Sequence, residues 1–174
     1  MNHFVNRIIR AGKLDVTLYE EVEHDKAAMA QAIGVVVLSS IAAGVGTFGI
    51  GMIAMGLNAI GAIIAWYIWA YLTYFIGTRL LAEPQTEADH GQLLRTIGFA
   101  SAPGLLRVLG VVPSIREIVF LVTSVWMLVA MVVAVRQALD YTSTLRAVGV
   151  CLLGWVVQAV ILLGIYLFVQ GMTS

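Results

Sequence analysis

Five long apolar stretches alternate with short polar ones along the chain, and each has about the length that a helix needs to cross a bilayer. The most sharply bounded, residues 115–135, ends at Arg136, Gln137 and Asp140, where charge is costly within lipid but tolerated at its edge. The other four cover residues 27–46, 53–80, 95–112 and 145–169. None alternates apolar with polar residues as barrel strands do, so the backbone hydrogen bonds must form within helices. The pattern predicts an all-α, polytopic integral membrane protein with a bundle of about five transmembrane helices.

The stretch at residues 95–112 differs from the others because polar and helix-breaking residues interrupt it. Pro103 lacks a backbone donor, and Arg107 places a charge inside a segment that is already short. We expect a kinked crossing, with a re-entrant hairpin as the alternative.

Two polar turns carry signals for helix starts. Thr86 stands three residues before Asp89, which resembles an N-cap with an acid in the first turn. Ser114 stands three residues before Glu117, which is the spacing of a capping box. The sequence therefore predicts that helices begin at these two turns.

The first 26 residues are too polar to cross a membrane. Their acids and bases lack the layout of a signal peptide, so we expect the segment to be retained. The apolar residues between Phe4 and Ile9 share one side of a short helix that suits the membrane surface. A second short helix, capped by Asp15, carries apolar residues on one side and acids on the other. We thus divide the chain into a cytoplasmic or interfacial segment, residues 1–26, and a membrane domain, residues 27–170.

Composition supports the membrane assignment. Of the 174 residues, 60% are hydrophobic and 11% charged, which is more apolar surface than a soluble domain of this size could bury. The formal net charge is zero, so nothing indicates a nucleic-acid partner.

Lys and Arg are distributed unequally between the two sides of the expected membrane. With the N-terminus in the cytoplasm, only Arg107 and Arg116 would lie outside, and every other Lys and Arg would lie inside. Five crossings from a cytoplasmic N-terminus place the C-terminus outside.

Three segments resemble bacterial members of the Yip1 family, and the resemblance extends over nearly the whole chain. They are residues 14–23 (LDVTLYEEVE), 93–106 (LLRTIGFASAPGLL) and 126–140 (WMLVAMVVAVRQALD). The resemblance implies five membrane-spanning helices, a cytoplasmic N-terminus and a place in the bacterial inner membrane. Eukaryotic members are membrane-traffic proteins that associate with Rab-type GTPases and with one another. Their Asp-Leu-Tyr-Gly motif is only partly echoed here, between Asp15 and Tyr19, without the glycine.

The sequence offers no set of residues for catalysis. It contains no His-Glu-x-x-His motif, no glycine-rich phosphate loop with its lysine, and no serine beside a buried histidine. The histidines lie in polar segments, and the single Cys151 lies in an apolar stretch where core filling is its ordinary role. We therefore expect no catalytic residue, no metal ligand, no cofactor and no enzymatic activity.

Six residues within the apolar stretches are candidates for an intramembrane polar site. Arg107 could extend towards the membrane edge or meet Glu117, or it could face a cavity as the partner of an anionic headgroup or solute. The others could pack and join helices or line a polar pathway. The full set is Tyr67, Tyr71, Tyr74, Pro103, Arg107 and Gln158.

A second set of candidates lies at the predicted cytoplasmic face. We expect the acidic helix after Asp15 to dock beneath the bundle and pair with Arg95 and Arg136, whereas in the alternative these charges are only solvated. The candidate interaction residues are Asp15, Tyr19, Glu20, Glu21, Arg95, Arg136 and Asp140.

These observations favour a protein that works by binding. We expect a scaffold, adaptor or membrane-organising protein whose partners are membrane lipids and another protein or a second copy of itself. The alternative is a small oligomeric channel or transporter for an ion, small solute or lipid, because five thin-loop spans are too few to enclose a pathway in one protomer.

Overall fold

The described part of the chain, residues 3–47 and 51–173 of a computed structural model, consists of helices joined by short turns and one longer loop, with no strand in those ranges. The first two residues of the predicted N-terminal segment lie outside the described residues. In chain order the helices are α1 (His3–Gly12), α2 (Val16–His24), α3 (Met29–Gly46), α4 (Met52–Phe75), α5 (His90–Ala100), α6 (Arg116–Ala138) and α7 (Thr144–Thr173). Four further helical segments are not α-helical, namely the π-helical η2 (Ile76–Leu80) and the 3-10 helices η1 (Lys26–Ala28), η3 (Ala102–Val111) and η4 (Pro113–Ile115).

Within the described residues, four helical segments are long and apolar enough to cross a membrane. They are Lys26–Gly46, Ile53–Leu80, Pro113–Ala138 and Thr144–Ile161. These segments coincide with four of the five stretches that the hydrophobic pattern indicated. The protein is therefore an all-α membrane protein.

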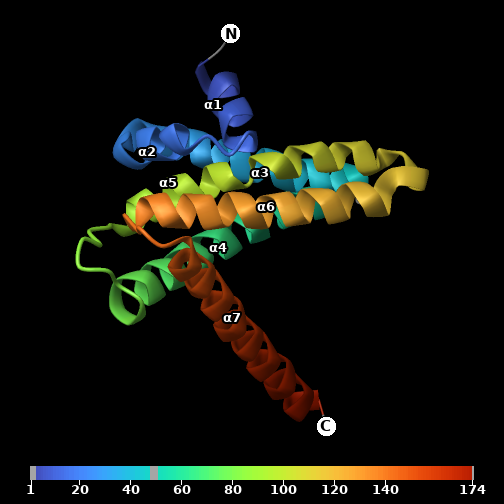
Figure 1. Cartoon of the computed structure of the whole chain (residues 1–174). Helices are drawn as coiled ribbons and strands as arrows, with labels where there is room; N and C mark the ends of the chain where they lie inside the picture. The colour runs from blue at the N-terminus through green and yellow to red at the C-terminus, as the bar shows by residue number, and fades with distance from the viewer. Residues whose placement is uncertain (1–2, 48–50, 174) are drawn as a thin grey trace.

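The remaining stretch, residues 95–112, forms the C-terminal half of α5 and the 3-10 helix η3. The break falls at Ser101, and Pro103 lies in the first turn of η3, where its missing donor costs least. The chain continues past the break in the same direction, and η3 lies beside α6 (Figure 1). The segment is thus bent and does not fold back as a hairpin.

Two predicted helix starts were wrong. α5 begins at His90, because Asp89 accepts a hydrogen bond from the backbone N–H of Gln92 (2.9 Å) and Gln92 accepts one in return. Thr86 instead accepts a hydrogen bond from the backbone of Glu83 (2.9 Å) within the loop. At the other turn, Pro113–Ile115 forms a separate 3-10 turn that includes Ser114, so α6 begins at Arg116 without a side-chain cap.

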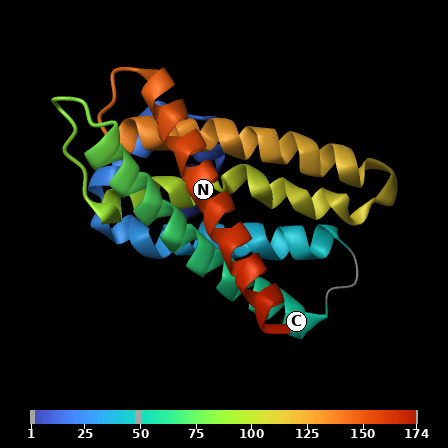
Figure 2. The same ribbon diagram turned by 90° about the horizontal axis from the view of Figure 1, so that it is seen from below.

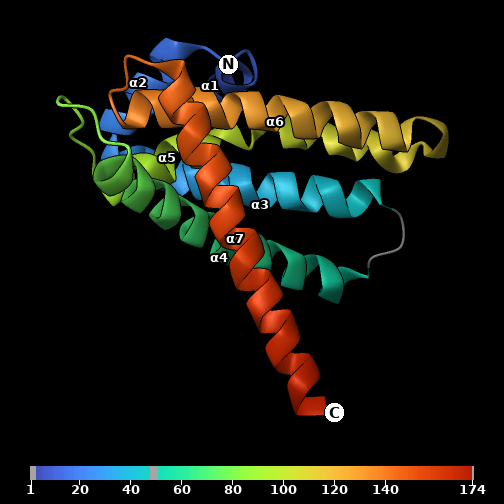
Figure 3. The same cartoon turned by 60° about the horizontal axis from the view of Figure 1, so that its bottom comes forward.

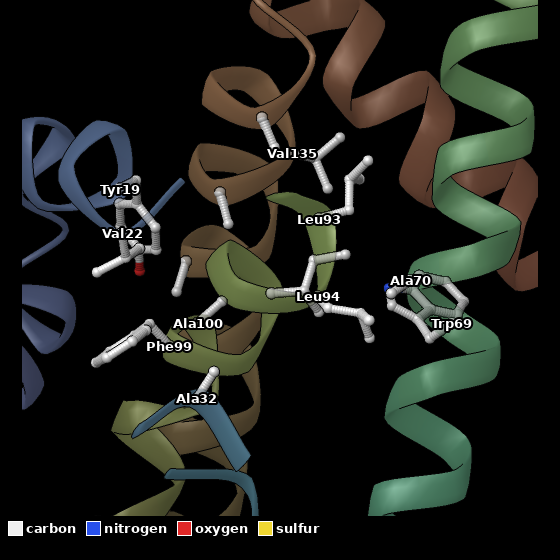
Figure 4. Packing of buried hydrophobic residues seen from close by; sticks show 14 of the residues in the cluster. Tyr19, Val22, Ala32, Trp69, Ala70, Leu93, Leu94, Phe99, Ala100 and Val135 are labelled. Atoms are coloured by element: carbon white, nitrogen blue, oxygen red, sulfur yellow. The ribbon is translucent and has the colours of Figure 1, made fainter. Parts of the chain in front are cut away.

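α5 lies at the centre of the hydrophobic core. All its residues from Leu93 to Ala100 are buried. Figure 4 shows the elements that surround it: α2 with Tyr19 and Val22, α3 with Ala32, α4 with Trp69 and Ala70, and α6 with Val135. The indole of Trp66 also donates to the backbone carbonyl of Leu94 (3.1 Å). Polar residues of α5 therefore face protein and not lipid.

α4 and α7 lie on one side of this core and diverge from it (Figures 2 and 3). α7 begins beside η2 and meets α4 further along, where Gly154 faces the ring of Trp69, and its C-terminal part points away from the other helices (Figure 3). Both helices expose large apolar side chains along their length, among them Ile53, Leu57, Ile60, Leu145, Val156 and Val160. These faces are suited to contact with lipid or with another apolar helix.

Candidate interaction site

The acidic helix α2 is joined to α1 by a network of ion pairs. The Asp15 carboxylate caps α2 by accepting from the backbone of Thr17 (3.0 Å) and also accepts from Arg10 (2.7 Å). The Arg10 guanidinium, with the Thr17 hydroxyl, lowers the pKa of Asp15 to about 2. Asp15 therefore holds the α1–α2 turn together.

Arg7 is the most enclosed member of this network. Its side chain is 5% exposed, and its three nitrogens donate to Glu21 (2.9 Å), Gln31 (3.1 Å) and Asp25 (2.8 Å). Burial raises the pKa of Glu21, but the hydrogen bonds from Arg10 and Arg7 outweigh it and leave that pKa low. Arg7 thus faces the protein, and the apolar residues of α1 are divided: Phe4 and Ile8 pack against the core, whereas Val5 and Ile9 are exposed.

α2 is docked on the bundle, as the sequence predicted. Leu18, Tyr19 and Val22 are fully buried. The Arg95 guanidinium, itself 5% exposed, donates to the backbone carbonyls of Val22 (2.8 Å) and Glu23. The predicted pairing of Arg95 with carboxylates was wrong, because Glu21 faces α1 and Glu20 faces α6. Arg95 instead meets the backbone carbonyls that the end of α2 leaves without partners.

The predicted pairing of Arg136 with these acids was also wrong. Arg136 donates to the backbone carbonyls of Tyr141 (3.2 Å) and Thr142 (3.4 Å) and so closes the turn that ends α6. The contact with α2 is made by the next residue, since the Gln137 amide donates to the Glu20 carboxylate (2.9 Å). In the sequence, Gln137 is one of several polar residues that end the apolar stretch, and nothing there indicated that it, and not Arg136, would contact α2.

A cavity of about 320 Å³ lies where α2 meets the end of α6. Three carboxylates line it together with one arginine and one histidine, and we call it the acidic pocket. Its residues are Glu20, Glu23, His24, Arg136, Gln137, Asp140 and Tyr141. It contains three of the seven interaction residues expected from the sequence, namely Glu20, Arg136 and Asp140. The other four are absent from its lining and join α2 to α1 or to α5, namely Asp15, Tyr19, Glu21 and Arg95.

Glu23 gives the acidic pocket an unusual titration. Its side chain is almost fully buried, and this burial, with the neighbouring Asp140 carboxylate, raises its pKa to about 7, whereas His24 and Arg95 act in the opposite direction. The folded state binds this proton more tightly than the unfolded state does, so protonation of Glu23 stabilises the fold. This contribution to the free energy of unfolding is complete below the usual pKa of 4.5 and is lost as the pH rises through about 7. A cation entering the acidic pocket would favour the charged form and displace this proton.

The three tyrosines of α4 surround a histidine. The rings of Tyr67, Tyr71 and Tyr74 lie 4.8, 5.8 and 6.3 Å from the ring of His90 and meet it at steep angles. Tyr67 and Tyr71 are more than half exposed, so they do not line an enclosed pathway within the described part of the protomer. The shared helical face of the tyrosines was visible in the sequence, but the position of His90 against it depends on how α5 follows the long loop.

The other intramembrane candidates lie apart from one another. Pro103 is buried in η3. Gln158 lines a cavity of about 290 Å³ between α4 and α7. Arg107 donates to the hydroxyls of Thr123 (3.3 Å) and Ser124 (3.0 Å) in the first half of α6, so of its alternatives the contact with Glu117 is not formed and the side chain lines cavities instead.

The described residues contain no group of three or more His, Cys, Asp or Glu side chains that could hold a metal ion. Cys151 is buried between helices.

Comparison with known proteins gives one match. A family model described as Yip1 domain matches residues 19–166, which extends from α2 into α7 and covers most of the chain. No curated protein and no solved structure matches.

Proposed function

The chain belongs to the Yip1 family, and we propose that it is a scaffold or adaptor of the bacterial inner membrane that recruits a protein partner or a second copy of itself. The family is one of membrane-trafficking proteins and is not known for enzymes, which supports a non-enzymatic role. One observation carries the proposal: docking of α2 against α6 creates a pocket rich in carboxylates at one end of the helix bundle.

The acidic pocket is suited to a basic segment of a partner. Glu20, Glu23 and Asp140 contribute carboxylates, whereas the Arg136 guanidinium already donates to two backbone carbonyls. A lysine or arginine from a partner would form charge-assisted hydrogen bonds there. Glu23 is buried, so a bond to it would form away from bulk water, whereas bonds to the exposed Glu20 and Asp140 would have the strength of surface ion pairs.

The exposed apolar faces of α4 and α7 offer a second contact surface, which in the membrane would meet lipid or another copy of the chain. The alternative function is a small oligomeric channel or transporter. The arrangement of the polar candidates gives it little support, because Arg107 and Gln158 line separate cavities and Tyr71 lies beside His90. A pathway would have to form between protomers.

We propose that the N-terminus is cytoplasmic and that α5 with η3 completes a fifth crossing, because η3 lies along α6 and ends beside the start of that helix (Figure 1). A cysteine replacing Thr86 should then react with a membrane-impermeant reagent only from the cytoplasm, and one replacing Ser174 only from outside. Labelling of both positions from the cytoplasm would contradict the fifth crossing, and the reversed pattern would contradict the orientation.

The proposed partner site is tested by neutralising two carboxylates of the acidic pocket. Glu20→Gln keeps an acceptor for Gln137, and Asp140→Asn keeps a residue that tolerates the positive φ of 52° found at this position. After crosslinking in native membranes and purification, recovery of the bound partner should fall by about tenfold, which corresponds to roughly 1.4 kcal/mol.

The matched control neutralises two acids outside the acidic pocket, Glu87→Gln and Glu117→Gln. This control should recover the partner as the unaltered protein does. Equal losses in both variants, or no loss in either, would contradict a partner site in the acidic pocket.

A further inference from the structure

A second, larger cavity lies within the helix bundle, away from the acidic pocket. It has a volume of about 600 Å³ and is bordered by α3, α4, η3 and α6. Although the surrounding helices are apolar, several of its lining side chains are polar. These are Ser39, Ser40, Thr47, Asn58, Ser101 and Arg107.

Arg107 is the only charged residue among the described residues that line this cavity. It is partly buried, its hydrogen bonds go to the hydroxyls of Thr123 and Ser124, and its guanidinium carbon lies 5.4 Å from the ring centre of Phe120. In the part of the chain that the structure describes, no carboxylate lies within 4.0 Å of it. A desolvated cation held by neutral groups alone is costly and would be stabilised by an anion.

A third cavity, of about 450 Å³, is also lined by Arg107 and lies between α6 and α7. Apart from Arg107 and Ser124, its lining is apolar or weakly polar and includes Met131, Leu152 and Trp155. Arg107 and Met127 border both cavities. The two cavities, which we call chambers, therefore place a polar, cationic space next to an apolar one. A phospholipid has the matching arrangement, because its polar headgroup is joined to apolar acyl chains.

Arg107 reaches a level well inside the membrane, where a charge without a counter-ion is costly. Ser124 lies eight residues after Arg116, so the contact with Arg107 is about 12 Å along α6 from the start of that helix. The apolar stretch 115–135 is about as long as the hydrocarbon core is thick, so this contact lies roughly 12 Å below the outer edge of that core, and a lipid phosphate reaches the guanidinium through the polar cavity.

We propose that these chambers form a binding site for an anionic phospholipid. The phosphate is held by the Arg107 guanidinium and by hydroxyl and amide donors of the polar cavity, in particular Ser101 and Asn58. One acyl chain lies in the apolar cavity between α6 and α7. The inference goes beyond the proposed partner site, because none of its residues lines the acidic pocket.

The test compares phosphatidylglycerol, phosphatidylcholine and inorganic phosphate as ligands of the protein purified in detergent. Lipid adducts are counted by native mass spectrometry, and melting temperatures are recorded with each ligand. The unaltered protein should retain phosphatidylglycerol in preference to phosphatidylcholine. Arg107→Gln should weaken phosphatidylglycerol binding by about tenfold, Arg107→Lys should restore part of it, and the charge-matched control Arg116→Gln should leave it unchanged.

A second variant keeps the test decisive if Arg107→Gln does not fold. Leu152→Trp fills the apolar chamber while the charge stays in place, and it should remove the phosphatidylglycerol adduct. Equal retention of both lipids in every variant would overturn the proposal. So would a stabilisation by inorganic phosphate, lost in Arg107→Gln, without any lipid adduct, because the site would then take a free anion.

Discussion

Replacing Gly46 with alanine should separate α3 from η3 and destabilise the protein by about 3 kcal/mol, near the upper end of the usual cost of overpacking. A Cβ atom at this position would overlap the backbone carbonyl oxygen of Arg107 and lie 3.2 Å from the ring of Phe120. A backbone atom cannot move aside by changing a rotamer, so the two elements would have to part. Thermal unfolding of the purified protein should show a clearly lower melting temperature.

The matched control is Gly56→Ala in α4, because a Cβ atom there would meet nothing within 4 Å. This change should be neutral or stabilise the helix by up to about 1 kcal/mol, since alanine has the higher helix propensity. Similar melting temperatures for the two variants would contradict the close packing of α3 on η3. The Gly46 variant should also bind phosphatidylglycerol less tightly, because the displaced segment carries Arg107.

Arg7→Gln should release α1 from α2 and cost on the order of 2 to 3 kcal/mol. The expected loss is below that of a fully buried ion pair, because the Glu21 and Asp25 side chains are about one third exposed. Three hydrogen bonds from a side chain that is 5% exposed are removed together. Hydrogen exchange should therefore become faster in both helices, and the melting temperature should fall.

Lys13→Gln is the control for the loss of one positive charge from the same segment, because Lys13 is exposed. It should leave exchange in α1 and α2 unchanged. If Arg7→Gln and Lys13→Gln behave alike, the ion pairs around Arg7 do not hold the two helices together.

Apolar length and charge placement were enough to predict most of the helices. Four of the predicted stretches match helical segments that can span a membrane, and the docked position of α2 followed from its apolar side. The 3-10 geometry of η3 and its close approach to Gly46 were not predictable, because Pro103 marks where the helix is interrupted but not what conformation follows or which helix packs on it.

The partners of the charged residues were harder to predict. The sequence correctly placed acids and arginines at the same end of the bundle, but the rotation of α2 decides which of them meet. That rotation directs Glu21 to Arg7 and Arg10 and gives Arg95 the backbone carbonyls of the helix end. Glu23, which the sequence analysis did not select, becomes the most buried carboxylate of the acidic pocket for the same reason.

Site-specific photo-crosslinking in native membranes tests the proposed partner site most directly. His24 lines the acidic pocket and is exposed, so a photoreactive residue there would contact a bound partner, whereas one at the exposed Ile68 faces away from the acidic pocket on α4. We expect a discrete protein adduct at position 24 that disappears in the Glu20→Gln, Asp140→Asn variant. Protein adducts at position 68 with none at position 24 would contradict the proposed partner site.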